Sequence, residues 1–181
     1  MPAPEIVAKN AFWSLCWAHP FFLPVLARLR FATGPVGTAC IRADGLVTVD
    51  PRFVAETPAI ELAGVMGHEA MHLLMCHAAR KGPREHTEWN KACDRAINAG
   101  LKDAGIRLPD GALYPDLTVW TATAERLYDH NQGQGQGQGQ GAPKATQGCG
   151  VDPTPGPGQG EGQGHPGQGE VDWQAVAAQC R

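Results

Sequence analysis

Two histidines and a glutamate stand at a spacing that suits a metal ion. His68 and His72 are four residues apart, so on a helix both imidazoles project from one face, one turn apart. Two ring nitrogens placed in this way can bind one Zn²⁺ at about 2.0–2.1 Å. Glu69 is turned by about 100° around the helix axis, so it would lie beside the metal rather than bind it. The pattern therefore predicts a zinc site with a carboxylate base next to it.

The chemistry of such a site is hydrolysis, with Glu69 as the catalytic residue. Glu69 could take the proton of a water molecule whose pKa the metal has lowered to about 7. The surrounding sequence is otherwise almost wholly apolar, and two histidines and a glutamate buried without partners would be costly. A polar stripe that merely faces solvent is therefore the less favoured interpretation.

A catalytic zinc needs a third protein ligand, and Asp94 is the predicted one. The helix that carries His72 is expected to run about 12 Å further before Gly82-Pro83 turns the chain. A helix that returns antiparallel from Thr87 regains the level of His72 after about eight residues, close to Asp94. A solvated helix charge is the alternative for Asp94.

Three further polar residues have roles that the sequence leaves open. Asn90 and Asn98 flank Asp94 at four-residue intervals, and this ridge suits either hydrogen-bonding support for a ligand or plain solvation. On an unbroken helix, His77 would point about 140° away from His72 and about 180° away from His68. We therefore expect His77 to lie outside the ligand set, as a hydrogen-bonding neighbour of the site or at the helix end.

The elements that must hold these residues are mainly helices. Helical spacing of apolar residues, with proline and glycine as stop signals, predicts helices over 4–18, 24–31, 58–81, 87–105 and 122–129. Thr57 is the expected N-cap of the long central helix, with Pro58 at its first position. Asp44-Gly45 separates two β-rich runs, 38–42 and 46–50, and predicts an antiparallel hairpin. The predicted fold class is α+β, a small mainly helical domain with one β-hairpin.

The composition changes sharply after Asn131. Residues 1–130 carry nearly all the apolar residues that could form a core. The stretch 131–170 is rich in Gly, Gln and Pro, which cannot bury a core, so a disordered linker is expected there. Residues 171–181 predict a short C-terminal helical remnant that cannot fold alone.

Charge and composition argue against several functional classes. The net charge is −3 and no basic cluster is present, so nucleic-acid binding is not expected. The apolar stretch 11–29 is interrupted by His19, Pro20 and Pro24, so a membrane span is not expected either. The six cysteines are scattered without a Cys-x-x-Cys pair, and no signal peptide is visible. These features favour a soluble protein in the reducing cytoplasm.

Two runs of residues resemble one known family. The run from Gly67 to His77, which contains His68-Glu69-Ala70-Met71-His72, and the run from Trp89 to Asn98 are similar to a bacterial and phage putative metallopeptidase domain. The similarity covers residues 10–130.

This resemblance implies a small zincin-like fold, with His68, His72 and Asp94 on zinc and Glu69 as the base. Members of the family usually carry a von Willebrand factor A-like domain after the linker, and some are associated with AAA-type ATPases. The resemblance therefore also implies a partner of one of these two kinds.

Two functions follow from these observations. The first is a zinc metallopeptidase that acts on a peptide or protein substrate, whose backbone one of the two predicted strands could hold as an added strand. That hairpin could equally be a lid on the core. The second is a non-catalytic, metal-stabilised binding or adaptor module that is tethered to a partner. A fourth protein ligand, such as His77 or Cys93, would favour the second function.

Overall fold

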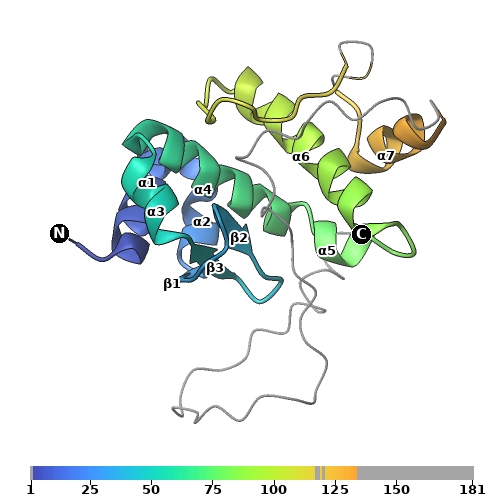
Figure 1. Ribbon diagram of the computed structural model, residues 1–181. Coiled ribbons are helices and arrows are strands. Elements are labelled where there is room, and N and C mark those ends of the chain that lie inside the picture. The colour runs from blue at the N-terminus through green and yellow to red at the C-terminus, as the bar shows by residue number, and fades with distance from the viewer. Residues whose placement is uncertain (1, 117–118, 120, 134–181) are drawn as a thin grey trace, which may run out of the picture.

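Helices make up most of the fold, and a small sheet packs beside them (Figure 1). The computed structural model describes residues 2–116, 119 and 121–133. Its elements along the chain are α1 (Pro4–Ala18), η1 (Pro20–Phe22), α2 (Leu23–Leu26), β1 (Arg30–Thr33), β2 (Ala39–Ile41), β3 (Leu46–Val49), α3 (Pro51–Glu56), α4 (Ala59–Leu74), α5 (His77–Arg80), α6 (His86–Asp103) and α7 (Ala124–Gly133). The predicted α+β class is confirmed. Helix α7 runs on to Gly133, so the predicted start of the linker at residue 131 is wrong by at least three residues. From residue 134 on, the predicted linker and helical remnant lie outside the described residues.

The predicted hairpin is confirmed, but it belongs to a three-stranded sheet. Strands β2 and β3 pair antiparallel, with Cys40 opposite Thr48, and Gly45 takes a positive φ of 80° in the turn between them. Strand β1 pairs parallel with the other side of β3, so the order is β1-β3-β2. Phe31, predicted as helical, lies in β1. The predicted helix over 24–31 is therefore wrong beyond Leu26, because pairing with a distant strand decides the conformation of this short apolar run.

The central helix begins later than predicted. Pro51 opens a separate helix, α3, whose N-cap Asp50 accepts a hydrogen bond from the backbone nitrogen of Arg52 at 2.9 Å. Thr57 ends α3, and its hydroxyl donates to the carbonyl oxygen of Phe53 at 2.6 Å. The prediction that Thr57 caps the long helix is therefore wrong. Helix α4 follows after Pro58.

Two glycines let α4 lie unusually close to its neighbours. A Cβ atom at Gly67 would lie 2.7 Å from Cδ2 of Leu15 in α1, and one at Gly64 would run into the backbone oxygen of Arg107. The main core forms around this contact, with Phe12 of α1 fully buried against α4. Gly64 thus permits the close approach of α4 to the backbone at Arg107, whereas at Gly67 the close neighbour is the flexible end of the Leu15 side chain.

A smaller apolar cluster joins α6 to α7. Trp89, Cys93 and Ala124 are buried in it, and Tyr128 packs at its edge. Helix α6 contacts both α4 and α7, so it connects the main core to this second cluster (Figure 1). Within the described residues, no helix has the length and apolar character needed to cross a bilayer.

Candidate metal centre

Helices α4 and α6 bring His68, His72 and Asp94 together, and the contacts show that the two helices run antiparallel. The Nε2 atoms of His68 and His72 are 3.0 Å apart. Oδ1 of Asp94 lies 3.2 Å from Nε2 of His72 and 3.5 Å from Nε2 of His68. Asn98, one turn further along α6, reaches back to His68. Later residues of α6 thus lie beside earlier residues of α4, as in an antiparallel pair of helices.

These three atoms are spaced like the ligands of one metal ion. Ligands held about 2.0–2.1 Å from a tetrahedral zinc are about 3.3 Å apart, and the observed separations bracket this value. All three side chains are nearly inaccessible, with exposed fractions of 7%, 1% and 3% for His68, His72 and Asp94. Within the part of the chain that the structure describes, Oδ1 of Asp94 is buried without a hydrogen-bond partner, as expected of an atom that binds a cation. The donor set therefore fits a metal.

The hydrogen bonds of Asn98 fix the protonation of His68. The amide nitrogen of Asn98 donates to the carbonyl oxygen of Leu113 at 2.8 Å, which turns its Oδ1 toward His68. Nδ1 of His68 lies 2.7 Å from that oxygen and must carry the proton, because an amide oxygen can only accept. Neutral His68 then presents the lone pair of Nε2 to the metal position. Asn98 is thus a support for His68, one of the two interpretations that the sequence left open.

Glu69 and Asp94 give the site its negative charge. Glu69 is completely buried on α4, next to His68. Burial alone would raise the pKa of Asp94, but the adjacent imidazoles of His68 and His72 lower it to about 2. Burial alone would lower the pKa of His68, but Asp94 and Glu69 together raise it. Two buried carboxylates beside two imidazoles form a place where a divalent cation offsets an otherwise costly charge.

The helix that carries the histidines breaks just after them, so the prediction of an unbroken helix is wrong. Helix α4 ends at Leu74, and Cys76 takes the left-handed conformation, with a φ of 53°. The break swings His77 back toward the site, where its Nδ1 lies 3.2 Å from Nδ1 of His72. His77 is buried, and burial, followed by the neighbouring charges, lowers its pKa to about 3. It is therefore neutral.

Contacts with α6 and α7 hold this break in place. Arg80 donates to the carbonyl oxygen of Met75 at 2.8 Å, and its guanidinium makes two further bonds, of 2.9 and 2.6 Å, to the carboxylate of Glu125. The indole nitrogen of Trp89 donates to the carbonyl oxygen of His77 at 3.0 Å. No local sequence signal announces the break, because a cysteine rarely takes a positive φ.

Cys93 does not belong to the group of candidate metal ligands. Cys93 is buried in the cluster between α6 and α7, where burial raises the pKa of its thiol. Asn90 is partly buried, and a role for it stays a prediction. Among the described residues, His68, His72 and Asp94 are the only group of three or more such side chains that could hold a metal.

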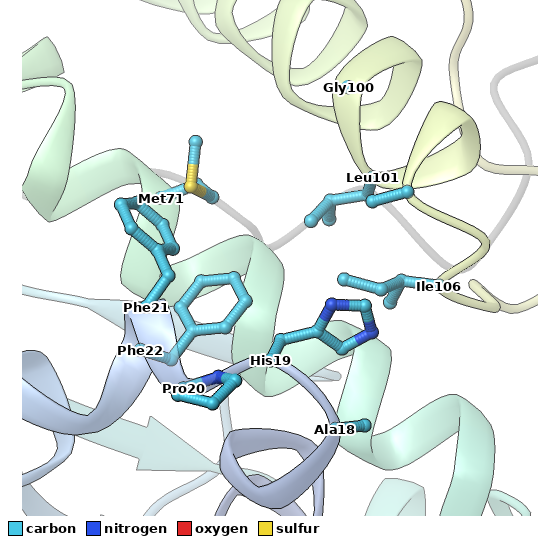
Figure 2. Close-up of a pocket in the computed structure, with 10 residues that line it drawn as sticks. Ala18, His19, Pro20, Phe21, Phe22, Met71, Gly100, Leu101 and Ile106 are labelled. Carbon is cyan, nitrogen blue, oxygen red and sulfur yellow. The ribbon is translucent and has the colours of Figure 1, made fainter.

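An apolar hollow of about 380 Å³ lies against the same two helices. Met71 of α4 and Phe22 of η1 line one side, and Leu101 of α6 and Ile106 line the other, with His19 between them (Figure 2). Met71 directly precedes His72 in the chain, so the hollow shares a wall with the helix of the histidines.

The chain matches the model of one known family. The model of a family described as "Putative metallopeptidase domain" matches residues 5–174. Neither the curated proteins nor the solved structures gave a match. The match to the family model covers nearly the whole chain and includes both helices that carry the candidate ligands. The chain therefore belongs to the putative metallopeptidase domain family.

Proposed function

We propose that the protein is a zinc-dependent peptidase. One observation carries the proposal: two imidazole nitrogens and one carboxylate oxygen lie within 3.5 Å of one another, with a second carboxylate, Glu69, buried beside them. Two histidines and one acidic residue, with a further position left for water, are the donor set of catalytic zinc in several peptidases. The family supports the same reaction class.

Each residue of the site has a separate role in the proposed hydrolysis. Zinc, when bound, supplies a Lewis acid that makes a nearby water acidic and polarises the peptide carbonyl. Glu69 takes a proton from the attacking water, whose oxygen forms the new bond to the carbonyl carbon. The carbon–nitrogen bond then breaks, and Glu69 passes the proton to the departing amine. His68, His72 and Asp94 hold the metal, and Asn98 holds His68.

The arrangement favours a catalytic site over the adaptor function. A purely structural zinc site is closed by a fourth protein ligand. The two candidates for that role do not join the group, since Cys93 is buried between α6 and α7 and His77 lies behind His72, against its Nδ1. A buried base at the position of Glu69 has no function in a structural site.

Two features suit a peptide substrate. Strand β3 is central in the sheet, so of the two hairpin strands β2 is the edge within the described residues, and it contacts α4. Such an edge can hold an extended peptide by backbone hydrogen bonds. The apolar hollow beside Met71 could then receive an apolar side chain of that peptide.

Filling the hollow should change which peptides are cleaved. Gly100 lines it, and a Cβ atom there meets nothing within 4 Å, so Gly100→Leu adds apolar bulk without a backbone clash. We expect about a 10-fold lower kcat/KM for peptides with a large apolar residue next to the cleaved bond, because about 1–3 kcal/mol of apolar binding is lost. Peptides with small residues there should be affected less.

Gly100→Ala is the matched control, because it makes the same change of helix propensity and adds only one methyl group. Kinetics with paired peptides that differ in the residue on each side of the cleaved bond would measure the effect. Equal loss for large and small residues would show that the hollow does not select the substrate.

Metal removal tests the proposed function itself. Protein purified without added metal should contain one zinc per chain by elemental analysis, and it should cleave an unfolded protein or a peptide library. A chelator should abolish cleavage, and one equivalent of zinc should restore it. Bound iron in place of zinc, or full activity in the chelated protein, would overturn the proposal. Tightly bound zinc with no cleavage would favour the adaptor function.

A further inference from the structure

A buried imidazole sits directly behind one of the candidate metal ligands. Nε2 of His72 faces His68 and Asp94, while its Nδ1 lies 3.2 Å from Nδ1 of His77. His77 is only 1% exposed, and its Nε2 is buried without a hydrogen-bond partner among the described residues. The peptidase chemistry described above makes no use of this residue.

The two rings share one proton along this contact. A histidine that binds a metal through Nε2 must have that nitrogen bare, so neutral His72 carries its proton on Nδ1. Among the described residues, Nδ1 of His77 lies at hydrogen-bond distance from this Nδ1, at 3.2 Å, and must then be the acceptor. His77 in turn carries its own proton on Nε2. The metal-binding form of His72 therefore sets the tautomer of both residues.

We propose that His77 is a positioning residue that accepts the Nδ1 proton of His72 and holds His72 ready for the metal. The proposal rests on the metal site of the proposed function. A carboxylate or a carbonyl oxygen usually accepts the second ring proton of a ligand histidine. For His68, the amide oxygen of Asn98 is this acceptor. In this site the imidazole of His77 is the acceptor for the Nδ1 proton of His72.

The surroundings of His77 keep its ring from turning away. Its backbone oxygen accepts from the indole of Trp89, and the two rings are in edge-to-face contact at 6.0 Å. The left-handed residue Cys76 precedes it, and Arg80 ties the broken helix end to Glu125. The helix break thus places His77 in contact with His72.

Two substitutions separate hydrogen bonding from packing. In His77→Asn, the amide oxygen takes the branch position of Nδ1 and can accept the same proton. In His77→Leu, the space stays filled but no acceptor remains. Zinc affinity, measured by competition with a chromophoric chelator, should fall about 10–100-fold in His77→Leu and stay within about threefold of the wild type in His77→Asn. Urea unfolding in excess chelator checks that both variants fold.

The outcomes distinguish this inference from the peptidase proposal. A wild type that binds no metal overturns both. Wild-type affinity in His77→Leu, or equal losses in both variants, overturns only the role of His77. If His77→Leu does not fold, ¹⁵N NMR of the zinc-loaded wild type decides the question. Protonated Nδ1 on His72 with bare Nδ1 on His77 supports the proposal, and a protonated Nδ1 on His77 overturns it.

Discussion

Glu69→Gln is expected to remove peptide hydrolysis and to leave the metal in place. The amide keeps the size of the side chain but cannot take a proton from water, and loss of a general base typically slows a reaction by about 10²–10⁴-fold. The ligand atoms on His68, His72 and Asp94 are unchanged, so zinc content should stay at one per chain. Cleavage assays and elemental analysis on the same preparation measure both quantities.

Glu61→Gln is the control for this variant, because it makes the same change on the same helix α4, well before the site. It should keep full activity. Undiminished hydrolysis by pure Glu69→Gln protein would exclude Glu69 as the base. Loss of zinc together with activity would instead assign Glu69 a part in holding the metal site.

Asp94→Ala is expected to empty the metal site. The substitution removes the only carboxylate among the three grouped ligands and leaves two histidines, so the loss of affinity should exceed the 10–100-fold typical of an outer hydrogen-bonding partner. Zinc content should fall from one per chain to near zero. After metal removal with a chelator, added zinc should raise the Tm of the wild type, because it binds the folded form, but not that of the variant.

Asp103→Ala on the same helix α6 is the matched control, since Asp103 is exposed near the helix end. Its zinc content and its Tm shift on zinc addition should equal those of the wild type. An Asp94→Ala protein that retains one zinc per chain would show that the third ligand is another residue.

The grouping of the candidate ligands could be predicted because it depends on short-range geometry. The four-residue spacing of His68 and His72 needs only a helix, and the apolar residues around them indicate one. Counting residues along a returning helix predicts that Asp94 lies level with His72, and in the structure Oδ1 of Asp94 lies 3.2 Å from Nε2 of His72 although the outgoing helix is broken. The functional roles of these residues and of Glu69 stay predictions until metal and activity are measured.

The features that could not be predicted depend on distant contacts. Strand β1 exists because it pairs with β3, whose sequence lies about 16 residues further on, and nothing in the run around Phe31 requires a strand. The break at Cys76 is held by Glu125 and Trp89 through α5, so a local pattern cannot reveal it. The direction of His77 follows from that break, so its predicted rotation away from His72 is wrong, whereas its contact with His72 agrees with the expected role as a hydrogen-bonding neighbour outside the ligand set.

The two glycines of α4 extend the recognition pattern of this site upstream of its first histidine. The backbone oxygen of Arg107 occupies the space of a Cβ atom at Gly64, and Cδ2 of Leu15 lies 2.7 Å from the place of one at Gly67, so both glycines allow the close packing of α4. A chain with the same histidine spacing but a larger residue in place of Gly64 would have to pack α4 further from the backbone at Arg107. Transfer of this metal centre to another protein should therefore include Gly64 and Gly67 as well as the ligand residues.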